Sequence, residues 1–166
     1  MSIAEAAYTY NQNGSVIKAG FVHHSAAIES LNRTETLDGN WGTYIITDNY
    51  VTLAGNKTGV MFKCGYAPAN RNMINLFTGA ALNLYGFLAG RPNDFLGMAV
   101  AYAGISKEFR QIYSTKAHET AIELTYRLAV NELMFFQPNL QYVINPGADK
   151  FLDNAFVGLL RFGITF

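Results

Sequence analysis

Hydrophobic and polar residues alternate with a period of two along almost the whole chain, as in its last nine residues, GLLRFGITF. Successive side chains of a β-strand point to opposite faces, so this alternation predicts strands with one apolar and one polar face. Many of the positions hold Tyr, Phe, Val, Ile or Thr, which favour strands. The pattern delimits nine segments, namely 3–10, 15–24, 42–53, 58–67, 74–85, 95–105, 119–131, 133–145 and 154–166.

The length of these segments favours a membrane. Most run for about 10–13 residues, whereas globular strands average about 5–6 and a tilted membrane-spanning strand needs about 9–11. The connections also alternate in length along the chain, as in outer-membrane β-barrels with short periplasmic turns and longer external loops. The longer set is 25–41, 68–73, 106–118 and 146–153. The shorter set is 11–14, 54–57, the junction near Asn131, and 86–94, which is long for its side.

Three segments fit this pattern less well. Segments 74–89 and 95–105 are rich in Ala and Leu and could be helical in isolation. Pro138 lies inside an expected strand, where it removes a hydrogen-bond donor from the ladder. We therefore expect a bulge at Pro138 or a shorter strand.

Composition supports a sheet with two unlike faces in a single domain, residues 1–166. Charged residues make up 14% of the chain, against about 25% in ordinary soluble domains. Aromatic residues also reach 14%, and the formal net charge is zero, which gives no field to attract nucleic acid. No signal peptide and no apolar run long enough for a transmembrane helix is evident, so a membrane location requires strands. A soluble β-barrel would alternate too and remains an alternative.

Few residues suggest chemistry. The single Cys64 excludes an internal disulfide and argues against a cysteine metal site. His23 and His24 are adjacent on an expected strand and face opposite sides, so they cannot chelate one metal ion. Glu119 and Glu123 are about 13 Å apart along a strand, which is too far for a glycosidase pair. We expect no enzyme activity, no cofactor and no metal.

Several longer motifs resemble a known family. These are DGNWGTYIITDNYV (38–51), GVMFKCGYAPANRNMINLF (59–77), GRPNDFLGMAVAYAGIS (90–106) and ETAIELTYRLAVNELMFFQPNLQYVINPG (119–147), followed by FGITF. In this order the chain resembles the C-terminal part of the carbohydrate-selective porins of the OprB type. The resemblance implies a sixteen-stranded outer-membrane β-barrel through which sugars diffuse passively.

The strand count departs from that family. Bacterial barrels have an even number of strands, and an open edge in hydrocarbon leaves backbone groups without partners. Nine strands therefore suggest a fragment, a truncated gene product or one part of a split porin. The alternative from the sequence is a closed eight-stranded barrel in which 3–10 does not pair, with its interior filled by side chains.

The polar positions of the expected strands supply candidate lumen residues. Four acids and four bases face inward, namely Glu5, Lys18, Asp48, Lys63, Glu119, Glu123, Arg127 and Arg161. We expect this balance to suit neutral solutes, with side-chain amides to bond sugar hydroxyls and Tyr85 to stack on sugar rings.

Glu123 and Arg127 lie too far apart to pair with each other, so we expect partners on other strands, such as Arg161 or Lys63. The alternative is that these side chains pair with one another and only fill the wall. The candidates for contact with solute are Lys18, Asp48, Lys63, Tyr85, Glu119, Glu123, Arg127, Gln137, Asn139, Gln141 and Arg161.

The expected partners follow from this reading. They are outer-membrane lipid, mono- or oligosaccharides as solutes, a second chain or further copies of this chain, and the outer-membrane assembly machinery. A terminal aromatic residue on an alternating strand resembles the signal that this machinery recognises, and Phe166 holds that place. A truncated remnant with a structural role and a soluble carbohydrate-binding barrel are the alternative functions.

Overall fold

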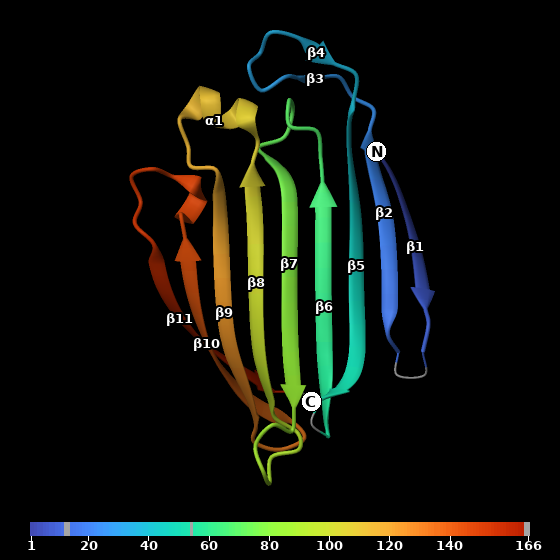
Figure 1. The fold of residues 1–166 in the computed structure, drawn as a ribbon, viewed down its shortest axis with the longest axis vertical. Coiled ribbons are helices and arrows are strands. Elements are labelled where there is room, and N and C mark those ends of the chain that lie inside the picture. Colours follow the sequence, from blue (N-terminus) through green and yellow to red (C-terminus); the bar gives the residue numbers. More distant parts are fainter. Residues whose placement is uncertain (12–13, 54, 165–166) are drawn as a thin grey trace.

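The computed structural model describes residues 1–11, 14–53 and 55–164. Nine strands form one antiparallel sheet in chain order, with β1 and β11 at its edges (Figure 1). The strands are β1 (Ser2–Thr9), β2 (Val16–His24), β5 (Asn40–Leu53), β6 (Asn56–Tyr66), β7 (Ile74–Tyr85), β8 (Phe95–Ile105), β9 (His118–Ala129), β10 (Met134–Ile144) and β11 (Ala155–Ile164). The connections hold β3 (Ile28–Glu29), β4 (Thr36–Leu37), α1 (Lys107–Tyr113) and the short helix η1 (Pro146–Ala148).

All nine expected strands are confirmed, with bounds that agree within two residues. The Ala- and Leu-rich segments, which could be helical in isolation, form strands β7 and β8 in the sheet. Each of them pairs with a neighbour on both sides, and this pairing outweighs local helix propensity. The expected role of Phe166 in assembly falls outside the described residues.

The connections separate into two ends of the sheet. The longer ones, which include α1, η1 and the β3–β4 hairpin, lie at the upper end in Figure 1, and the turns between β5 and β6 and between β9 and β10 lie at the lower end. The expected alternation of long and short connections is therefore present. Helix α1 was not expected, although Ser106 is a typical N-cap whose side chain accepts a hydrogen bond from the Phe109 amide. None of the described helices is long and apolar enough to cross a membrane.

Strand β10 runs through Pro138 without a bulge, so the expected bulge is wrong, and the strand is one residue shorter at each end than the expected 133–145. Pro138 pairs with Leu160 of β11, and the register with β9 is the same before and after it. The Thr125 hydroxyl donates to the Pro138 carbonyl at 3.1 Å. A side-chain donor thus bonds the chain where the proline interrupts the ladder. The register shift in the β7–β8 pairing lies instead between Ile74 and Leu76.

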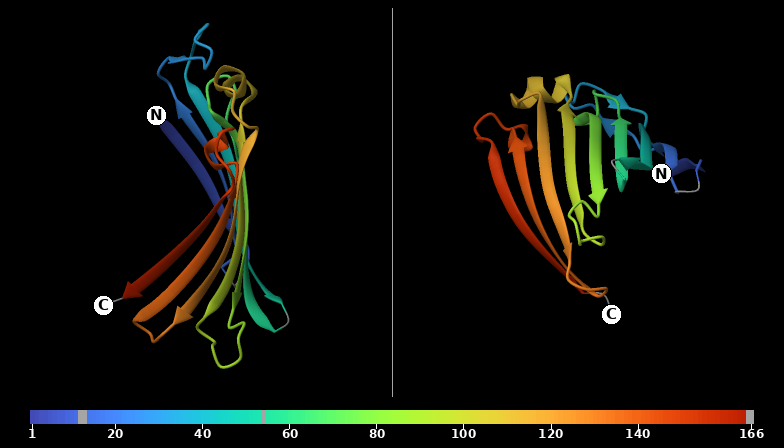
Figure 2. Two further views of the ribbon diagram at one scale, coloured as in Figure 1. Left: turned by 90° about the vertical axis from the view of Figure 1, so that its left-hand side faces the viewer. Right: turned by 60° about the horizontal axis from the view of Figure 1, so that its bottom comes forward.

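The sheet is twisted and curved but open (Figure 2). β1 pairs with β2 over eight residue pairs, from Ser2–His23 to Thr9–Val16, so the eight-stranded alternative without 3–10 is wrong. Within the described residues β1 and β11 each have one strand neighbour, and they do not pair with each other. Both edges therefore present backbone groups that further strands can pair with.

The turn 86–94, unusually long for the lower end, is held by a buried carboxylate. Asp94 is 1% exposed and binds Arg91 through both oxygens, at 2.8 and 3.0 Å. Asp94 also accepts hydrogen bonds from the Tyr126 hydroxyl and the Ala129 amide. Arg91 in turn donates to the Ala129 carbonyl at 2.9 Å. This Asp94 clamp, formed by these four residues, ties the β7–β8 turn to the end of β9.

The hydrogen bonds set the charge state of the clamp. Burial alone would raise the pKa of the Asp94 carboxyl, but the bonds from Arg91, Tyr126 and the Ala129 amide outweigh it and hold that pKa below its ordinary value. The same bond to Asp94 raises the pKa of the Arg91 guanidinium. Both groups are therefore charged at neutral pH.

Candidate lumen face

The register assigns every strand residue to one of two faces, because directly paired residues lie on the same face. All nine charged residues of the large sheet fall on one face, which we call the polar face. They are Glu5, Lys18, Asp48, Lys57, Lys63, Glu119, Glu123, Arg127 and Arg161. Among the described strand residues, the opposite, apolar face carries no Asp, Glu, Lys or Arg.

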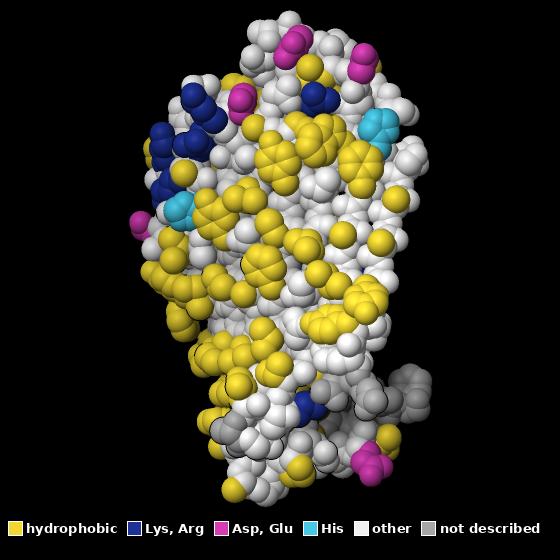
Figure 3. Space-filling model, turned by 45° about the vertical axis from the view of Figure 1, so that its right-hand side comes forward, with side chains coloured by type: hydrophobic (Ala, Val, Ile, Leu, Met, Phe, Trp, Pro, Cys, Tyr) yellow, Lys and Arg dark blue, Asp and Glu magenta, His cyan; other side chains and the backbone are white. Residues whose placement is uncertain are grey.

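The apolar face is almost uncovered. Figure 3 shows hydrophobic side chains across the middle of the sheet and charged ones toward its two ends. Phe156 and Leu160 are each 71% exposed, and only Ile105 and Ala148 are buried among the described hydrophobic residues. A soluble protein rarely leaves an apolar surface of this extent open to water.

Most aromatic side chains on the apolar face gather toward both strand ends, with Phe62 in the middle of β6 as the exception. The upper group is Phe21, Trp41, Tyr66, Tyr102, Tyr142 and Phe156, and the lower group is Tyr8, Tyr126, Phe136 and Phe162. Rings touch within each group, with centroids 5.8 Å apart for Trp41–Tyr66 and 4.9 Å for Phe136–Phe162. Along β10 the two groups are about 20 Å apart, given a rise of about 3.3 Å per residue. Aromatic girdles flanking an apolar band of about 25 Å are typical of membrane β-barrels.

All eleven residues proposed from the sequence as solute contacts lie on the polar face. The sequence missed Lys57, because it placed residues 54–57 in a turn, whereas β6 begins at Asn56. Lys57 pairs with Thr52 on the polar face. The balance in the strands is therefore four acids to five bases, not four to four.

Five of these residues line a cavity of about 290 Å³ on the polar face of β9, β10 and β11. Its polar lining is Glu123, Gln137, Asn139, Gln141 and Arg161. The Gln141 amide donates to Glu123 at 2.8 Å, and the Gln137 amide donates to the Thr125 hydroxyl at 3.0 Å. The Asn139 side-chain oxygen is buried and has no hydrogen-bond partner. A buried acceptor without a partner is costly, so Asn139 can gain a bond from a hydroxyl that enters the cavity.

The ion pairs expected for Glu123 and Arg127 do not form. Glu123 bonds to Gln141, and the Arg127 guanidinium lies over the Phe135 ring, 4.0 Å from its centroid. Lys63 lies over Phe77 at 4.9 Å. The sequence could not foresee this, since strand register decides which side chains become neighbours. In the described strands the one ion pair joins Lys18 to Glu5 at 3.9 Å, between half-exposed side chains.

Tyr85 stands on the polar face near the lower end of β7. Its ring is 5.7 Å from that of Phe95 and 5.7 Å from the Lys57 ammonium. Lys57 also lies 4.3 Å from the centre of the Tyr50 ring. The three rings and the cation form a continuous surface on which a sugar ring could stack.

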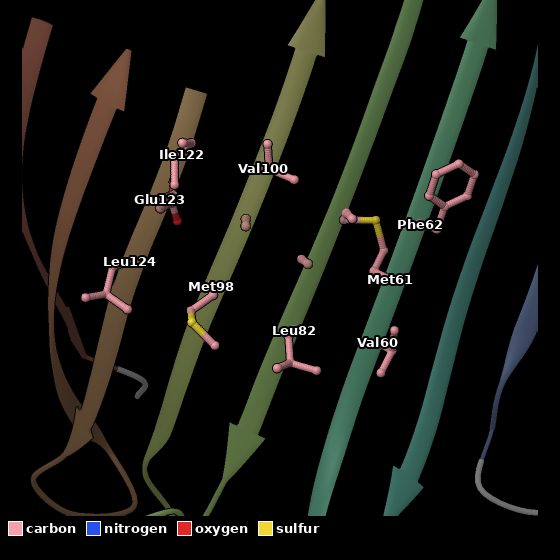
Figure 4. Close-up of a pocket in the computed structure, with 12 residues that line it drawn as sticks. Val60, Met61, Phe62, Leu82, Met98, Val100, Ile122, Glu123 and Leu124 are labelled. Carbon is pink, nitrogen blue, oxygen red and sulfur yellow. The ribbon is translucent and has the colours of Figure 1, made fainter. Parts of the chain in front are cut away.

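A depression of about 540 Å³ lies on the opposite, apolar face (Figure 4). Three consecutive residues from each of β6, β7, β8 and β9 line it, and in each strand the first and third of these have their side chains on the apolar face. The side chains that line it from the apolar face contain no oxygen or nitrogen atom to form hydrogen bonds. The apolar-face lining residues are Val60, Phe62, Ala80, Leu82, Met98, Val100, Ile122 and Leu124.

In residues 1–11, 14–53 and 55–164, no three His, Cys, Asp or Glu side chains lie close enough together to hold a metal ion. The His23 ring lies on the apolar face and stacks on Phe21 at 6.4 Å. Cys64 is half-buried on the same face, paired with Thr78 and Ile45.

Known proteins share this sequence pattern and this sheet. The sequence model described as carbohydrate-selective porin, OprB family, matches residues 4–166. The solved structure titled "High pH structure of Pseudomonas putida OprB" superposes with a TM-score of 0.88 at 19% sequence identity. The match covers 99% of this chain and 48% of that one, so the chain spans about half the length of the solved structure. No curated protein matches the chain.

Proposed function

The chain belongs to the OprB family of carbohydrate-selective porins, and from this premise we propose that its polar face lines a water-filled channel for the passive diffusion of sugars across an outer membrane. The observation that carries the proposal is the complete sorting of charge. All nine charged strand residues share one face, and the other face holds an apolar band between two aromatic girdles. Water on one side and lipid on the other account for this division.

The open edges imply further strands. In hydrocarbon, an unpaired backbone group costs several kcal/mol, so β1 and β11 both need a partner strand in the membrane. A further segment or a second chain can supply these strands, and we call the closed assembly the complete pore. Insertion by the outer-membrane assembly machinery, through Phe166, belongs to the same proposal.

The polar face suits weak and repeated contact with sugars. Gln137, Asn139 and Gln141 provide amide donors and acceptors, and Tyr85 with Phe95 provides rings. Sugar hydroxyls both donate and accept hydrogen bonds, so they can exchange one such partner for the next. Contacts of this strength let a solute enter and leave, as conduction requires. This chemistry is that of a channel rather than an enzyme.

Replacing the amides of the cavity should weaken sugar binding without closing the pore. We expect Asn139→Leu with Gln141→Leu to raise the glucose concentration that half-blocks ion current about 3–10-fold, since neutral hydrogen bonds contribute about 0.5–1.5 kcal/mol each. The measurement is glucose block of single-channel conductance in the complete pore. Leu140→Val, between them on the apolar face, is the matched control and should leave block unchanged. Equal block in all three proteins would refute the assignment of the cavity.

A further inference from the structure

Charge on the polar face is sorted into rows that run across the strands. Residues that pair directly across successive strands form one row, and neighbouring rows of this face are two residues apart. One row close to the lower turns contains Lys57 on β6, Tyr85 and Phe95 on β7 and β8, Arg127 on β9 and Arg161 on β11. We call Lys57, Arg127 and Arg161 the cationic row. The strand positions in this row contain no acid.

The acids of the strands lie in other rows. Asp48 and Glu123 share a row four residues further up the strands, about 13 Å away at about 3.3 Å per residue. The row between, which includes Asn83, Thr125 and Asn139, carries no charge. At physiological ionic strength the screening length is about 8 Å, so the acids leave most of the field of the cationic row in place.

The cations of this row are not neutralised by contacts. In the described residues none of the three has a carboxylate within 4.0 Å, whereas Lys18 and Arg91 each have one. Lys57 lies over Tyr50, and Arg127 lies over Phe135. Rings orient a cation but leave its charge in place. The exposed Glu132 of the β9–β10 turn shares a cavity with Arg127 but makes no ion pair.

We propose that the cationic row binds the anionic group of acidic sugars, namely sugars that carry a carboxylate or a phosphate, at the lower end of the lumen. Guanidinium groups bind both anions through paired hydrogen bonds, and Lys57 adds a point charge. The rings of Tyr85 and Phe95, between Lys57 and Arg127 in the row, offer a surface for the sugar. This inference rests on the proposed function and adds a solute class, since the sequence alone suggested neutral solutes.

The test measures ion preference and sugar flux separately in the complete pore. Zero-current potentials in gradients of potassium gluconate and of potassium glucose 6-phosphate give the preference for each anion over potassium, and vesicle swelling gives glucose flux. The lumen variant combines Lys57→Gln, Arg127→Gln and Arg161→Gln. Its control removes three exposed cations outside the nine-stranded sheet through Arg33→Gln, Lys107→Gln and Lys150→Gln. The exposed single variant Arg161→Gln serves if the triple variant does not fold.

We expect the native pore to prefer the anion. The single variant should lose that preference about four-fold, because the attraction between two unit charges about 5 Å apart in water corresponds to this factor. The lumen variant should lose it about ten-fold, because its two further charges act on the same anion from a greater distance and are screened. The control should keep it, and glucose flux should change less than two-fold. A preference for gluconate alone would show that the cationic row binds a carboxylate. A preference for glucose 6-phosphate alone would show that it binds a phosphate. Equal preference in native and variant pores, or none in a native pore that passes glucose, overturns the inference and leaves the proposed function standing. A native pore that passes no glucose overturns the proposed function itself.

Discussion

An arginine in place of Val100 should destabilise the folded protein by about 2–4 kcal/mol in lipid. Val100 is the sixth of eleven residues in β8 and lies on the apolar face, 41% exposed, so the new charge would lie near the middle of the bilayer. Charged groups at that depth on the lipid side of a membrane barrel cost about this much. The measurement is urea unfolding of the complete pore in vesicles, followed by its heat-modifiable migration.

The neighbouring substitution Ala101→Arg is the matched control, since the same charge would then enter the polar face. We expect it to change the free energy of unfolding by less than about 1 kcal/mol, because water reaches that side chain. If both substitutions had the same large cost, the two faces of β8 would not differ in their contact with lipid. The face assignment would then be wrong.

Asp94→Asn should produce the second large effect, a loss of about 2–3 kcal/mol in the free energy of unfolding at pH 7. The substitution keeps the shape of the side chain but removes the charge that Arg91, Tyr126 and the Ala129 amide all bind. Hydrogen bonds to a charged group contribute about 1.5–3 kcal/mol, and this group is buried. The exposed Asn93→Ala in the same turn should change stability by less than about 0.5 kcal/mol.

The pH dependence separates the clamp from simple packing. The pKa of the Asp94 carboxyl is lower in the folded than in the unfolded protein, where it is about 3.8, so the stabilisation is fully present above pH 3.8. It is lost as the pH falls through the lower, folded value. The gap between the native protein and Asp94→Asn should therefore be constant from pH 5 to 8 and shrink only below pH 3.8. A gap that closes near neutral pH would contradict the charge state assigned to Asp94.

The strands could be predicted from the sequence because the residues on their two faces differ so strongly in polarity. In β9 the alternation of Ile122 and Leu124 with Glu123 and Thr125 fixes both the strand and its faces. Even β7 and β8, rich in helix-favouring Ala and Leu, keep the period of two. These strands are also longer than those of typical soluble sheets, and this length indicated a membrane protein.

Contacts between strands could not be predicted, because register sets them. Period two places Glu123 and Arg161 on the same face but does not say which rows they occupy, and the expected ion pair proved wrong. Lys57 was missed because the sequence AGNK, residues 54–57, is typical of a turn, whereas β6 already begins at Asn56. Pro138 suggested a bulge, and the Thr125 hydroxyl that bonds its carbonyl comes from another strand.

The central claim is that β8 has one side in lipid and one in the sugar pathway. The most direct test treats the complete pore, with Val100→Cys or Ala101→Cys, with a membrane-impermeant, charged thiol reagent and then measures glucose flux by vesicle swelling. Native Cys64 lies on the apolar face and should stay unmodified, so it needs no replacement. We predict that the reagent modifies Ala101→Cys and at least halves glucose flux, while Val100→Cys is neither modified nor blocked. Equal modification of the two cysteines, or modification of Ala101→Cys without loss of flux, would contradict the account.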